Sequence, residues 1–261
     1  MIVFPNAKIN IGLNIIEKRT DGLHNINSCF YPVPWYDALE VIEAEKFNFT
    51  TTGIDIPGEA NICIHAYELI KRDFPLPPVN IHLHKNIPIG AGLGGGSADG
   101  AFMLKLLNDK FSLNLPIDQL QNYASQLGSD CPFFIENTPC YVEGTGNVFS
   151  PISMNLEGLF IAILYPKIHV ETKLAYSKIT PTEPGVTLKE ILESNPVNNW
   201  PSLIANDFEK NADAGILQLK KMLYNQGAHY SSMTGSGSAV YGLFSKRPDL
   251  NTSHPNIIAE L

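Results

Sequence analysis

Apolar and polar residues alternate along residues 8–15, and this period of two predicts a β-strand. Successive side chains of a strand point to opposite faces, so the apolar positions define a buried face. Lys8 and Asn10 share the other face, on which we expect them to project away from the core. The same alternation over residues 79–84 predicts a second strand, with His82 and His84 together on its polar face.

Apolar residues three and four positions apart predict helices elsewhere in the chain. We expect them over residues 61–74, 98–107, 117–127, 171–178, 187–193 and 216–223. Further strands are predicted at residues 39–43, 140–143, 159–165 and 239–244. Residues 194–201 are predicted to form a loop. Helices and strands are mixed without a regular βαβ rhythm, and the pattern restarts near residue 150. The predicted fold class is therefore α+β in two parts, residues 1–152 and 153–261.

A glycine-rich run connects the strand at residues 79–84 to the helix that follows. Five of the twelve residues from Pro88 to Asp99 are glycine. Glycine lets a ligand approach bare backbone N–H groups and permits turns with positive φ. The start of a helix adds N–H donors and a partial positive charge. Together these features predict a site for the phosphates of a nucleotide. A flexible surface loop is the alternative, but such a loop rarely leads directly into an apolar helix.

Three known phosphate-binding patterns can be compared with this run. Gly90, Gly92 and Gly95 satisfy the dinucleotide pattern G-x-G-x-x-G, but the sequence does not indicate the parallel βαβ unit that should accompany it. The Walker A pattern needs Lys and then Ser or Thr after the last glycine, whereas Ser97 follows Gly96 directly. The third pattern, P-x-G-x-G-L-G-G-G-S, matches along its whole length and is the phosphate loop of the GHMP kinases.

Composition and charge narrow the function classes. The chain has 261 residues, 44% hydrophobic and 17% charged, which predicts an ordered globular protein. A net charge of −8 argues against a broad nucleic-acid-binding surface. An anion site must then concentrate positive potential locally. The candidates for this are the glycine run, Lys8, His82, His84, Lys85 and Lys105.

Cysteine usage and apolar runs predict the compartment. The four cysteines show neither a C-x-x-C pair nor zinc spacing, so we expect reduced thiols in a cytoplasmic protein and no metal site of their own. Lys8 and Asn10 interrupt the apolar start, which argues against a signal peptide. The longest apolar run, residues 159–165, is too short to span a bilayer.

Three separated segments resemble the motifs of the GHMP kinases in order and spacing, from one end of the chain to the other. They are residues 5–13 (Pro-Asn-Ala-Lys-Ile-Asn-Ile-Gly-Leu), the glycine run, and residues 232–240 (Ser-Met-Thr-Gly-Ser-Gly-Ser-Ala-Val). This resemblance implies an ATP-dependent small-molecule kinase of the two-domain GHMP kinase fold. It implies an N-terminal domain similar to ribosomal protein S5 domain 2 and a ferredoxin-like C-terminal domain.

Two further segments resemble those GHMP kinases that act on a cytidine-diphosphate-linked methylerythritol. Residues 19–24, Arg-Thr-Asp-Gly-Leu-His, are similar to their R-x-D-G-[YF]-H segment. Residues 128–134, Gly-Ser-Asp-Cys-Pro-Phe-Phe, are similar to their G-[AS]-D-[VI]-P-F-F. The resemblance implies phosphorylation of the 2-hydroxyl of the methylerythritol unit, in the non-mevalonate route to isoprenoids. Leu23 stands where that family often has an aromatic that packs on the cytosine, whereas Tyr176 matches the second such aromatic.

The same resemblance implies roles for individual residues. Asp130 accepts or orients the proton of the substrate hydroxyl, and Lys8 keeps that carboxylate ionised. The residues implied to bind ATP, which arrives with Mg²⁺, are Asn61, Pro88, Gly90, Gly92, Leu93, Gly94, Gly95, Gly96 and Ser97. The residues implied to bind the cytidine substrate are Asn10, His24, Tyr31, Tyr176, Gly235 and Ser236.

Several of these residues also have a simpler structural interpretation. An aspartate such as Asp130, between Gly128 and Pro132, commonly bonds the backbone of its own turn. Lys8 fits a solvated strand lysine, and His24 fits a polar turn residue. Ser97 and Asn61 each stand where a helix N-cap would. His82 and His84 lack further ligands at metal spacing, so we interpret them as structural.

Two other functions stay open at this point. One is another small-molecule GHMP kinase, acting on mevalonate or homoserine, and the other is a non-catalytic ligand sensor with the same fold. Residues 19–24 and Tyr176 favour cytidine recognition, and the joint presence of Lys8 and Asp130 favours an enzyme. We expect a small-molecule substrate, no nucleic-acid or membrane partner, and a monomer or weak homodimer. Val at position 94 or 95 is expected to weaken ATP binding more than folding.

Overall fold

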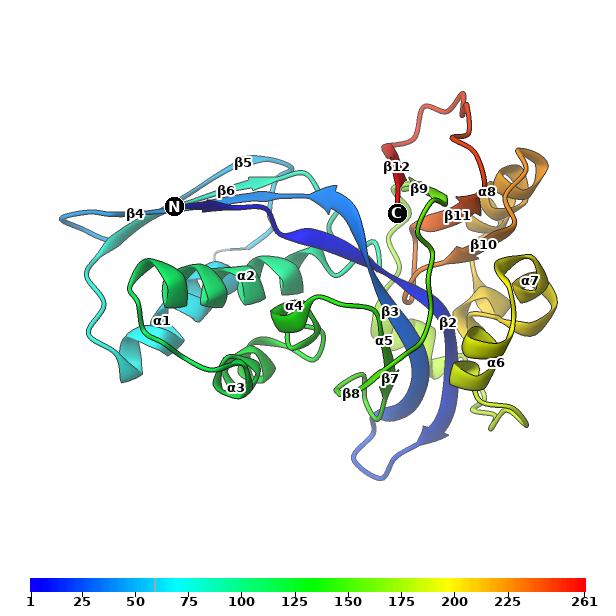
Figure 1. Cartoon of the computed structure of the whole chain (residues 1–261), viewed down its shortest axis with the longest axis horizontal. Coiled ribbons are helices and arrows are strands. Elements are labelled where there is room, and N and C mark those ends of the chain that lie inside the picture. The colour runs from blue at the N-terminus through cyan, green and yellow to red at the C-terminus, as the bar shows by residue number, and fades with distance from the viewer. Residues whose placement is uncertain (59) are drawn as a thin grey trace. The chain divides into compact units, whose positions relative to one another are not determined.

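The computed structural model describes residues 1–58 and 60–261, and its elements confirm the α+β class (Figure 1). The strands are β1 (Ile2–Val3), β2 (Asn6–Lys18), β3 (His24–Tyr36), β4 (Ala38–Glu43), β5 (Asn48–Gly53), β6 (Val79–Lys85), β7 (Cys140–Glu143), β8 (Val148–Pro151), β9 (Phe160–Leu164), β10 (Tyr230–Met233), β11 (Val240–Phe244) and β12 (Asn256–Glu260). The helices are α1 (Ile62–Asp73), α2 (Gly95–Lys110), α3 (Ile117–Leu127), α4 (Phe133–Glu136), α5 (Thr172–Ser177), α6 (Leu188–Ser194), α7 (Trp200–Leu203) and α8 (Ala214–Asn225), with 3₁₀ turns η1 (Val197–Asn199) and η2 (Asp207–Asn211).

The chain forms two compact units, each built from separate stretches of sequence. Unit 1 contains Met1–Ala7, Trp35–Ile89 and Gly94–Thr138. Unit 2 contains Lys8–Pro34, Gly90–Leu93 and Pro139–Leu261. These bounds differ from the expected boundary near residue 152, and the sequence domains 1–152 and 153–261 remain a prediction.

Unit 1 contains a four-stranded sheet in the order β1-β4-β6-β5. β5 runs parallel to β6, whereas the other pairs are antiparallel. Parallel neighbours need a crossover connection, and α1 supplies it between β5 and β6. Helices α1 and α2 pack together along one side of this sheet (Figure 1). Buried residues of the strands and helices, among them Leu39, Ile81, Tyr67 and Leu104, form the core.

Local sequence sets the ends of two helices in unit 1. α1 begins where Asn61 Oδ1 accepts a hydrogen bond from the Cys63 N–H at 2.9 Å. It ends at Phe74, because the next residue is a proline. α3 ends at Gly128, whose N–H donates to the Ala124 carbonyl. The helices predicted at residues 61–74 and 117–127 are therefore confirmed.

Unit 2 contains two further four-stranded sheets. Their strand orders are β2-β3-β7-β8 and β10-β11-β9-β12, and every pair in the second sheet is antiparallel. Helix α8 packs against β10 and β11. The core between them includes Leu13, Leu164, Phe208, Ile216 and Leu223.

Two predictions about local structure are wrong. Residues 194–201, expected to form a loop, contain η1 and the start of α7, because the indole of Trp200 is buried and donates to the Asn195 carbonyl. Lys8 and Asn10 are not solvated, since their exposed fractions are 3% and 2%. Strands β1, β3, β5, β8, β10 and β12 were not predicted. Among the helices of the described residues, none is long and apolar enough to cross a membrane.

Candidate active site

The first half of the glycine run, Gly90–Leu93, is held by three segments of unit 2. The Lys8 N–H donates to the Leu93 carbonyl at 2.9 Å, and the Ala239 N–H donates to the Ala91 carbonyl at 3.1 Å. Thr234 Oγ1 donates to the Gly92 carbonyl at 3.0 Å. A Cβ on Gly92 would stand 2.1 Å from the Thr234 carbonyl oxygen, and its φ is +78°. Glycine at this position is therefore required for packing, independently of any ligand.

The second half of the run starts helix α2 in unit 1. Gly94, with φ +68°, is the N-cap, and no side chain caps the helix. The prediction that Ser97 caps α2 is wrong, because Ser97 is the third residue of the helix and Gly94 takes the cap position. The first N–H groups of a helix have no intrahelical acceptor. The start of α2 thus offers backbone donors to an anion.

Gly95 and Gly96 differ in their surroundings. A Cβ on Gly95 would meet Ile87 Cγ2 at 2.8 Å and Lys85 Nζ at 3.0 Å. Nothing lies within 4 Å of a Cβ on Gly96, which is exposed. Valine at position 95 would therefore disturb packing directly, and position 96 is the better probe of ligand approach. Pro88, just before the run, is buried.

A buried ionic cluster lies beneath the first turns of α2. Lys85 Nζ donates to Asp37 Oδ2 and to Asp99 Oδ2, the latter at 2.7 Å. Asp37 Oδ1 accepts the N–H groups of Asn86 and Ile87 at 2.6 and 2.8 Å. Asp99 Oδ1 is buried with no hydrogen-bond partner in the described part of the chain. Burial, opposed by Lys85 and reinforced by Asp37, raises the pKa of Asp99 to about 8.

This cluster corrects one expectation about local positive potential. Lys85 was a candidate source, but its ammonium is buried and paired with Asp37, and Asp99 accepts a second hydrogen bond from it. His82 and His84 form hydrogen bonds with the hydroxyls of Thr50 and Thr52, as their structural interpretation predicts.

Lys105, another expected source of positive potential, lies over the Phe102 ring, and burial lowers the pKa of its ammonium.

Lys8 and Asn10 form a buried pair on β2. Lys8 Nζ donates to Asn10 Oδ1 at 2.7 Å and lies 4.2 Å from the centre of the Phe30 ring. Asn10 Nδ2 donates to Ser28 Oγ at 2.8 Å. The solvated interpretation of Lys8 is therefore wrong. A buried ammonium with a fixed partner is typical of a site that binds negative charge.

The two residues implied to recognise cytidine lie in contact in unit 2. The rings of His24 and Tyr176 stack with centroids 5.0 Å apart and planes 25° apart. Tyr176 also meets Phe208 edge-on, with centroids 4.9 Å apart. Burial, assisted by the Lys18 ammonium, lowers the pKa of His24 and so favours its neutral form, which can both donate and accept. Leu23 is 54% exposed, and Tyr31 is half-buried.

The third motif forms a tight turn after β10. Gly235 has φ +57°, and a Cβ there would stand 3.1 Å from the Gly92 Cα. The hydroxyls of Ser236 and Thr172 lie 3.1 Å apart. The structure therefore brings Gly235 next to Gly92 within unit 2. Thr234 lies in the motif quoted from the sequence but was given no role there, because its contacts link distant segments.

Asp130 and Asn61 belong to unit 1. Asp130 is half-buried in the turn between α3 and α4. Its neighbour Cys131 is buried, which raises the thiol pKa to about 12, and a hydrogen bond with Ser97 opposes that rise. The 128–134 segment is thereby joined to the start of α2. Asn61 is the N-cap that its simpler interpretation predicts, using Oδ1.

No cluster of three or more His, Cys, Asp or Glu side chains suited to a metal ion occurs among residues 1–58 and 60–261. Any Mg²⁺ that accompanies ATP would therefore rely on phosphate oxygens, water and a hydroxyl such as Ser97, as this ion often does. The uncapped start of α2 and the open space at Gly96 fit a nucleotide phosphate.

Comparison with known proteins adds independent evidence. Residues 61–137 match the model of the GHMP kinases N terminal domain. The chain is similar to a 4-diphosphocytidyl-2-C-methyl-D-erythritol kinase of Bacteroides fragilis, with 51% identity over 94% of this chain and 92% of that one. A kinase of the same name from Cytophaga hutchinsonii is 48% identical, over 98% and 96% of the two chains. The fold is similar to a crystal structure of 4-(cytidine 5'-diphospho)-2C-methyl-D-erythritol kinase, with a TM-score of 0.80, 27% identity, and 93% and 90% of the chains covered.

Proposed function

The chain belongs to the GHMP kinases, in the family of 4-diphosphocytidyl-2-C-methyl-D-erythritol kinases. From this premise we propose which of its residues bind ATP, which bind the substrate and which catalyse phosphoryl transfer. It is an ATP-dependent kinase that phosphorylates 4-diphosphocytidyl-2-C-methyl-D-erythritol in isoprenoid biosynthesis. The structural observation that best supports the proposed substrate site is the stacked pair of His24 and Tyr176, both of which the resemblance assigned to cytidine.

ATP binds, in this proposal, through its phosphates at the start of α2 and along the glycine run. The contributing residues are Pro88, Gly90, Gly92, Leu93, Gly94, Gly95, Gly96 and Ser97. Asn61 uses Oδ1 to cap α1, which leaves Nδ2 as the group that would meet the nucleotide. Mg²⁺, when bound with ATP, supplies positive charge that neutralises the phosphates, and Ser97 Oγ is the side-chain group that would help to hold it.

The cytidine substrate binds through Asn10, His24, Tyr31, Tyr176, Gly235 and Ser236. The 5.0 Å between the His24 and Tyr176 rings is less than the roughly 7 Å that a base sandwiched between two rings needs, at about 3.5 Å per contact. Cytosine would therefore stack beside this pair or separate it. The neutral His24 ring is suited to the cytosine edge, which carries both donors and acceptors.

Phosphoryl transfer proceeds by attack of the substrate 2-hydroxyl oxygen on the γ-phosphorus of ATP. The new O–P bond forms as the bond from the γ-phosphorus to the β–γ bridging oxygen breaks, and ADP leaves. Asp130 accepts the hydroxyl proton, and the Lys8 ammonium stabilises the negative charge that develops. Catalysis of this kind depends mostly on positioning and electrostatics.

The substrate panel tests the activity. We expect ATP consumption with 4-diphosphocytidyl-2-C-methyl-D-erythritol and none with mevalonate, homoserine or galactose. Turnover of one of the other acceptors alone would show that the protein is a GHMP kinase with a different substrate. ATP binding without turnover on any acceptor would instead support a ligand sensor.

Two variants test the catalytic roles. Asp130→Asn and Lys8→Ala should each lower kcat at least about tenfold, which is about 1.4 kcal/mol in the barrier, with a smaller effect on ATP affinity. Asp118→Asn, at the exposed start of α3, and Lys71→Ala, whose ammonium lies over the Tyr67 ring, are matched controls and should leave kcat unchanged. The double variant should be little worse than the more damaged single one if both groups act in one step. Near wild-type kcat in both single variants would place the chemistry elsewhere.

The remaining expectations stay proposals. We expect a monomer or weak homodimer in sedimentation experiments and a cytoplasmic location, which the reduced state of Cys29, Cys63, Cys131 and Cys140 favours. We expect no binding to nucleic acid, given the net charge of −8.

A further inference from the structure

One four-residue segment of unit 2, Asn206–Glu209, contacts two of the residues proposed to bind the cytidine substrate. Asn206 bonds the Gly235 carbonyl, and Phe208 packs against the Tyr176 ring. The segment lies alongside β2, where the Leu13 N–H donates to the Ala205 carbonyl at 3.0 Å and the Ile15 N–H to Asp207 Oδ2 at 2.8 Å. Asn206, Asp207 and Phe208 are all buried. The segment is therefore fixed to the strand that carries Lys8 and Asn10.

The amide of Asn206 holds the third motif. Its Nδ2 donates to the carbonyls of Met233 and Gly235, at 2.9 and 2.8 Å, and its Oδ1 accepts the Phe208 N–H at 3.0 Å. These two carbonyls flank Thr234. Only a side chain with two N–H donors and one acceptor satisfies all three bonds. Aspartate would lose both donated bonds and alanine all three, including the bond to the Gly235 carbonyl.

Thr234 passes this restraint to two other parts of the proposed site. Its hydroxyl donates to the Gly92 carbonyl at 3.0 Å and accepts the Asn10 N–H at 2.9 Å. Tyr241 adds a bond from its hydroxyl to the Asn10 carbonyl at 2.9 Å. Hydrogen bonds and the backbone of the turn together thus connect Asn206 to the glycine run and to the start of β2.

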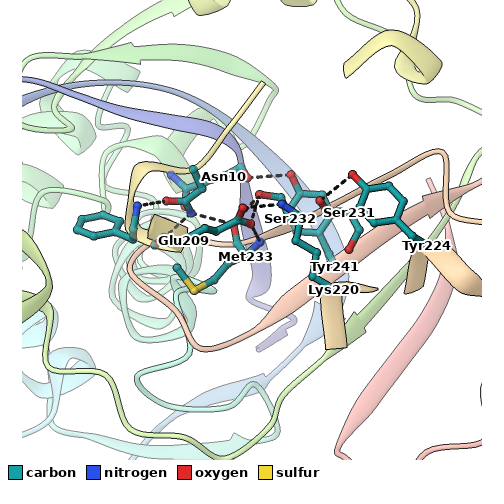
Figure 2. Close-up of polar contacts among 11 residues, drawn as sticks. Asn10, Glu209, Lys220, Tyr224, Ser231, Ser232, Met233 and Tyr241 are labelled. Carbon is teal, nitrogen blue, oxygen red and sulfur yellow. Dashed lines mark hydrogen bonds and ion pairs between the residues drawn. The ribbon is translucent and has the colours of Figure 1, made fainter. Parts of the chain in front are cut away.

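Glu209 fixes the strand that leads into the turn (Figure 2). Its Oε1 accepts the Ser232 hydroxyl at 3.0 Å and the Met233 N–H at 2.8 Å. Its Oε2 accepts from Lys220 Nζ at 2.5 Å, so the ammonium of α8 balances the carboxylate. Phe208, which lies between Asn206 and Glu209 in the sequence, packs edge-on against Tyr176. The segment therefore also supports the ring proposed to stack on cytosine.

We propose that Asn206 and Glu209 are positioning residues for the cytidine substrate, holding the 233–235 turn in the geometry that Gly235 and Ser236 need to bind it. This inference rests on the proposed function. It predicts a kinetic effect confined mainly to one substrate, which a residue that only stabilises the fold would not produce.

The test compares Asn206→Asp with Asn108→Asp in the full-length enzyme. Asn108 in unit 1 also bonds backbone groups at both ends of its amide, donating to the Leu115 carbonyl and accepting its N–H. Asn206→Asp should raise KM for the cytidine substrate by about tenfold or more, with KM for ATP within about threefold. Asn108→Asp should leave both KM values within about threefold of wild type, even if it lowers the thermal midpoint as much as Asn206→Asp does. Equal KM values in wild type and Asn206→Asp would overturn the proposal.

A second variant and a second measurement keep the proposal testable if Asn206→Asp folds poorly. Glu209→Gln retains the acceptor for Ser232 and Met233 and should raise the substrate KM by only a few fold, whereas Glu209→Ala should match Asn206→Asp. Amide hydrogen exchange of residues 233–237 should accelerate by about tenfold or more in Asn206→Asp and not in Asn108→Asp. If the wild type fails to phosphorylate the cytidine substrate, the proposed function is wrong, and slow exchange of this turn in both variants would show that Asn206 does not position it.

Discussion

The Asp37–Lys85–Asp99 cluster of unit 1 contains two acidic side chains and one ammonium, whereas in unit 2 the neutral amide of Asn206 holds the 233–235 turn. Both lie next to glycine-bearing backbone proposed to contact substrate. The ionic cluster leaves one buried oxygen, Asp99 Oδ1, without a partner among residues 1–58 and 60–261, while the amide of Asn206 uses both its oxygen and its nitrogen. Removing one member of a buried ion pair is costly, and the charge of such a pair depends on pH, whereas an amide does not titrate.

The largest expected effect on stability comes from comparing the removal of two ammonium groups, Lys85 in unit 1 and Lys220 in unit 2. Lys85→Met should lower the free energy of unfolding by at least about 3 kcal/mol, because Asp37 loses its buried partner. Lys220→Met should lower it by about 1 kcal/mol or less, because the Lys220 side chain is 27% exposed. Urea unfolding at pH 7 measures both values. Equal losses would show that the deeper burial of Lys85 does not make its ion pair more important for stability than that of Lys220.

Two glycines of the same run give the next comparison. Gly92→Ala should lower the free energy of unfolding by about 2 kcal/mol or more, since its φ is +78° and a Cβ would collide with the Thr234 carbonyl. Gly96→Ala should be neutral or stabilising by up to about 1 kcal/mol, because its Cβ meets open space in a helix. Gly96→Ala should nevertheless raise KM for ATP if phosphate approaches there. Thermal unfolding and ATP kinetics on the same samples separate these roles, and an unchanged KM would exclude close phosphate approach at Gly96.

The smallest expected effect is a change in pH dependence. The raised pKa of Asp99, about 8 against about 3.9 unfolded, means that the native state holds an extra proton between these values. Stability should therefore fall as pH rises from about 4 to about 8. Lys85, Asp37 and Cys63 are the titratable neighbours of Asp99.

Asp99→Asn replaces the titrating carboxyl group with a neutral amide. It should therefore weaken the dependence of the free energy of unfolding on pH. Between pH 7 and pH 8 the wild type should lose about 1 kcal/mol relative to the variant. Urea unfolding across that range is the measurement, with Asp109→Asn at the end of α2 as the control. A wild type that gains stability relative to Asp99→Asn as pH rises would show that Asp99 is ionised in the native state.

Local signals predicted the parts of the fold that local physics decides. Asn61 and Gly128 mark helix ends because a cap side chain and a C-terminal glycine act within a few residues. The alternation in β2 predicted a strand but not the burial of its polar face. A lysine and an asparagine that bond each other can be buried, and nothing in the spacing of Lys8 and Asn10 shows that Ser28 and Phe30 cover them.

The missed features depend on partners far away in the sequence. Asn206 bonds residues 27 and 29 positions later, and Lys85 meets Asp37 across 48 positions. Sequence reasoning could name Lys85 as a cation but not the acidic side chains that bond it. The candidate site itself was inferred mostly from motif resemblance, and its geometry shows which glycines serve packing and which face open space.

The order in which the two units can fold during synthesis follows from the way their segments interleave along the chain. Unit 1 is complete once Thr138 has been made, whereas unit 2 needs residues up to the end of the chain. Asn10 must wait for Thr234, 224 positions later, which at about 5–20 residues per second is roughly 10 to 45 seconds of synthesis. A premature stop codon after Thr138 and ahead of β10 would therefore yield a chain that contains all of unit 1, with α2 and its glycines, but in which the start of β2 lacks the turn that holds it.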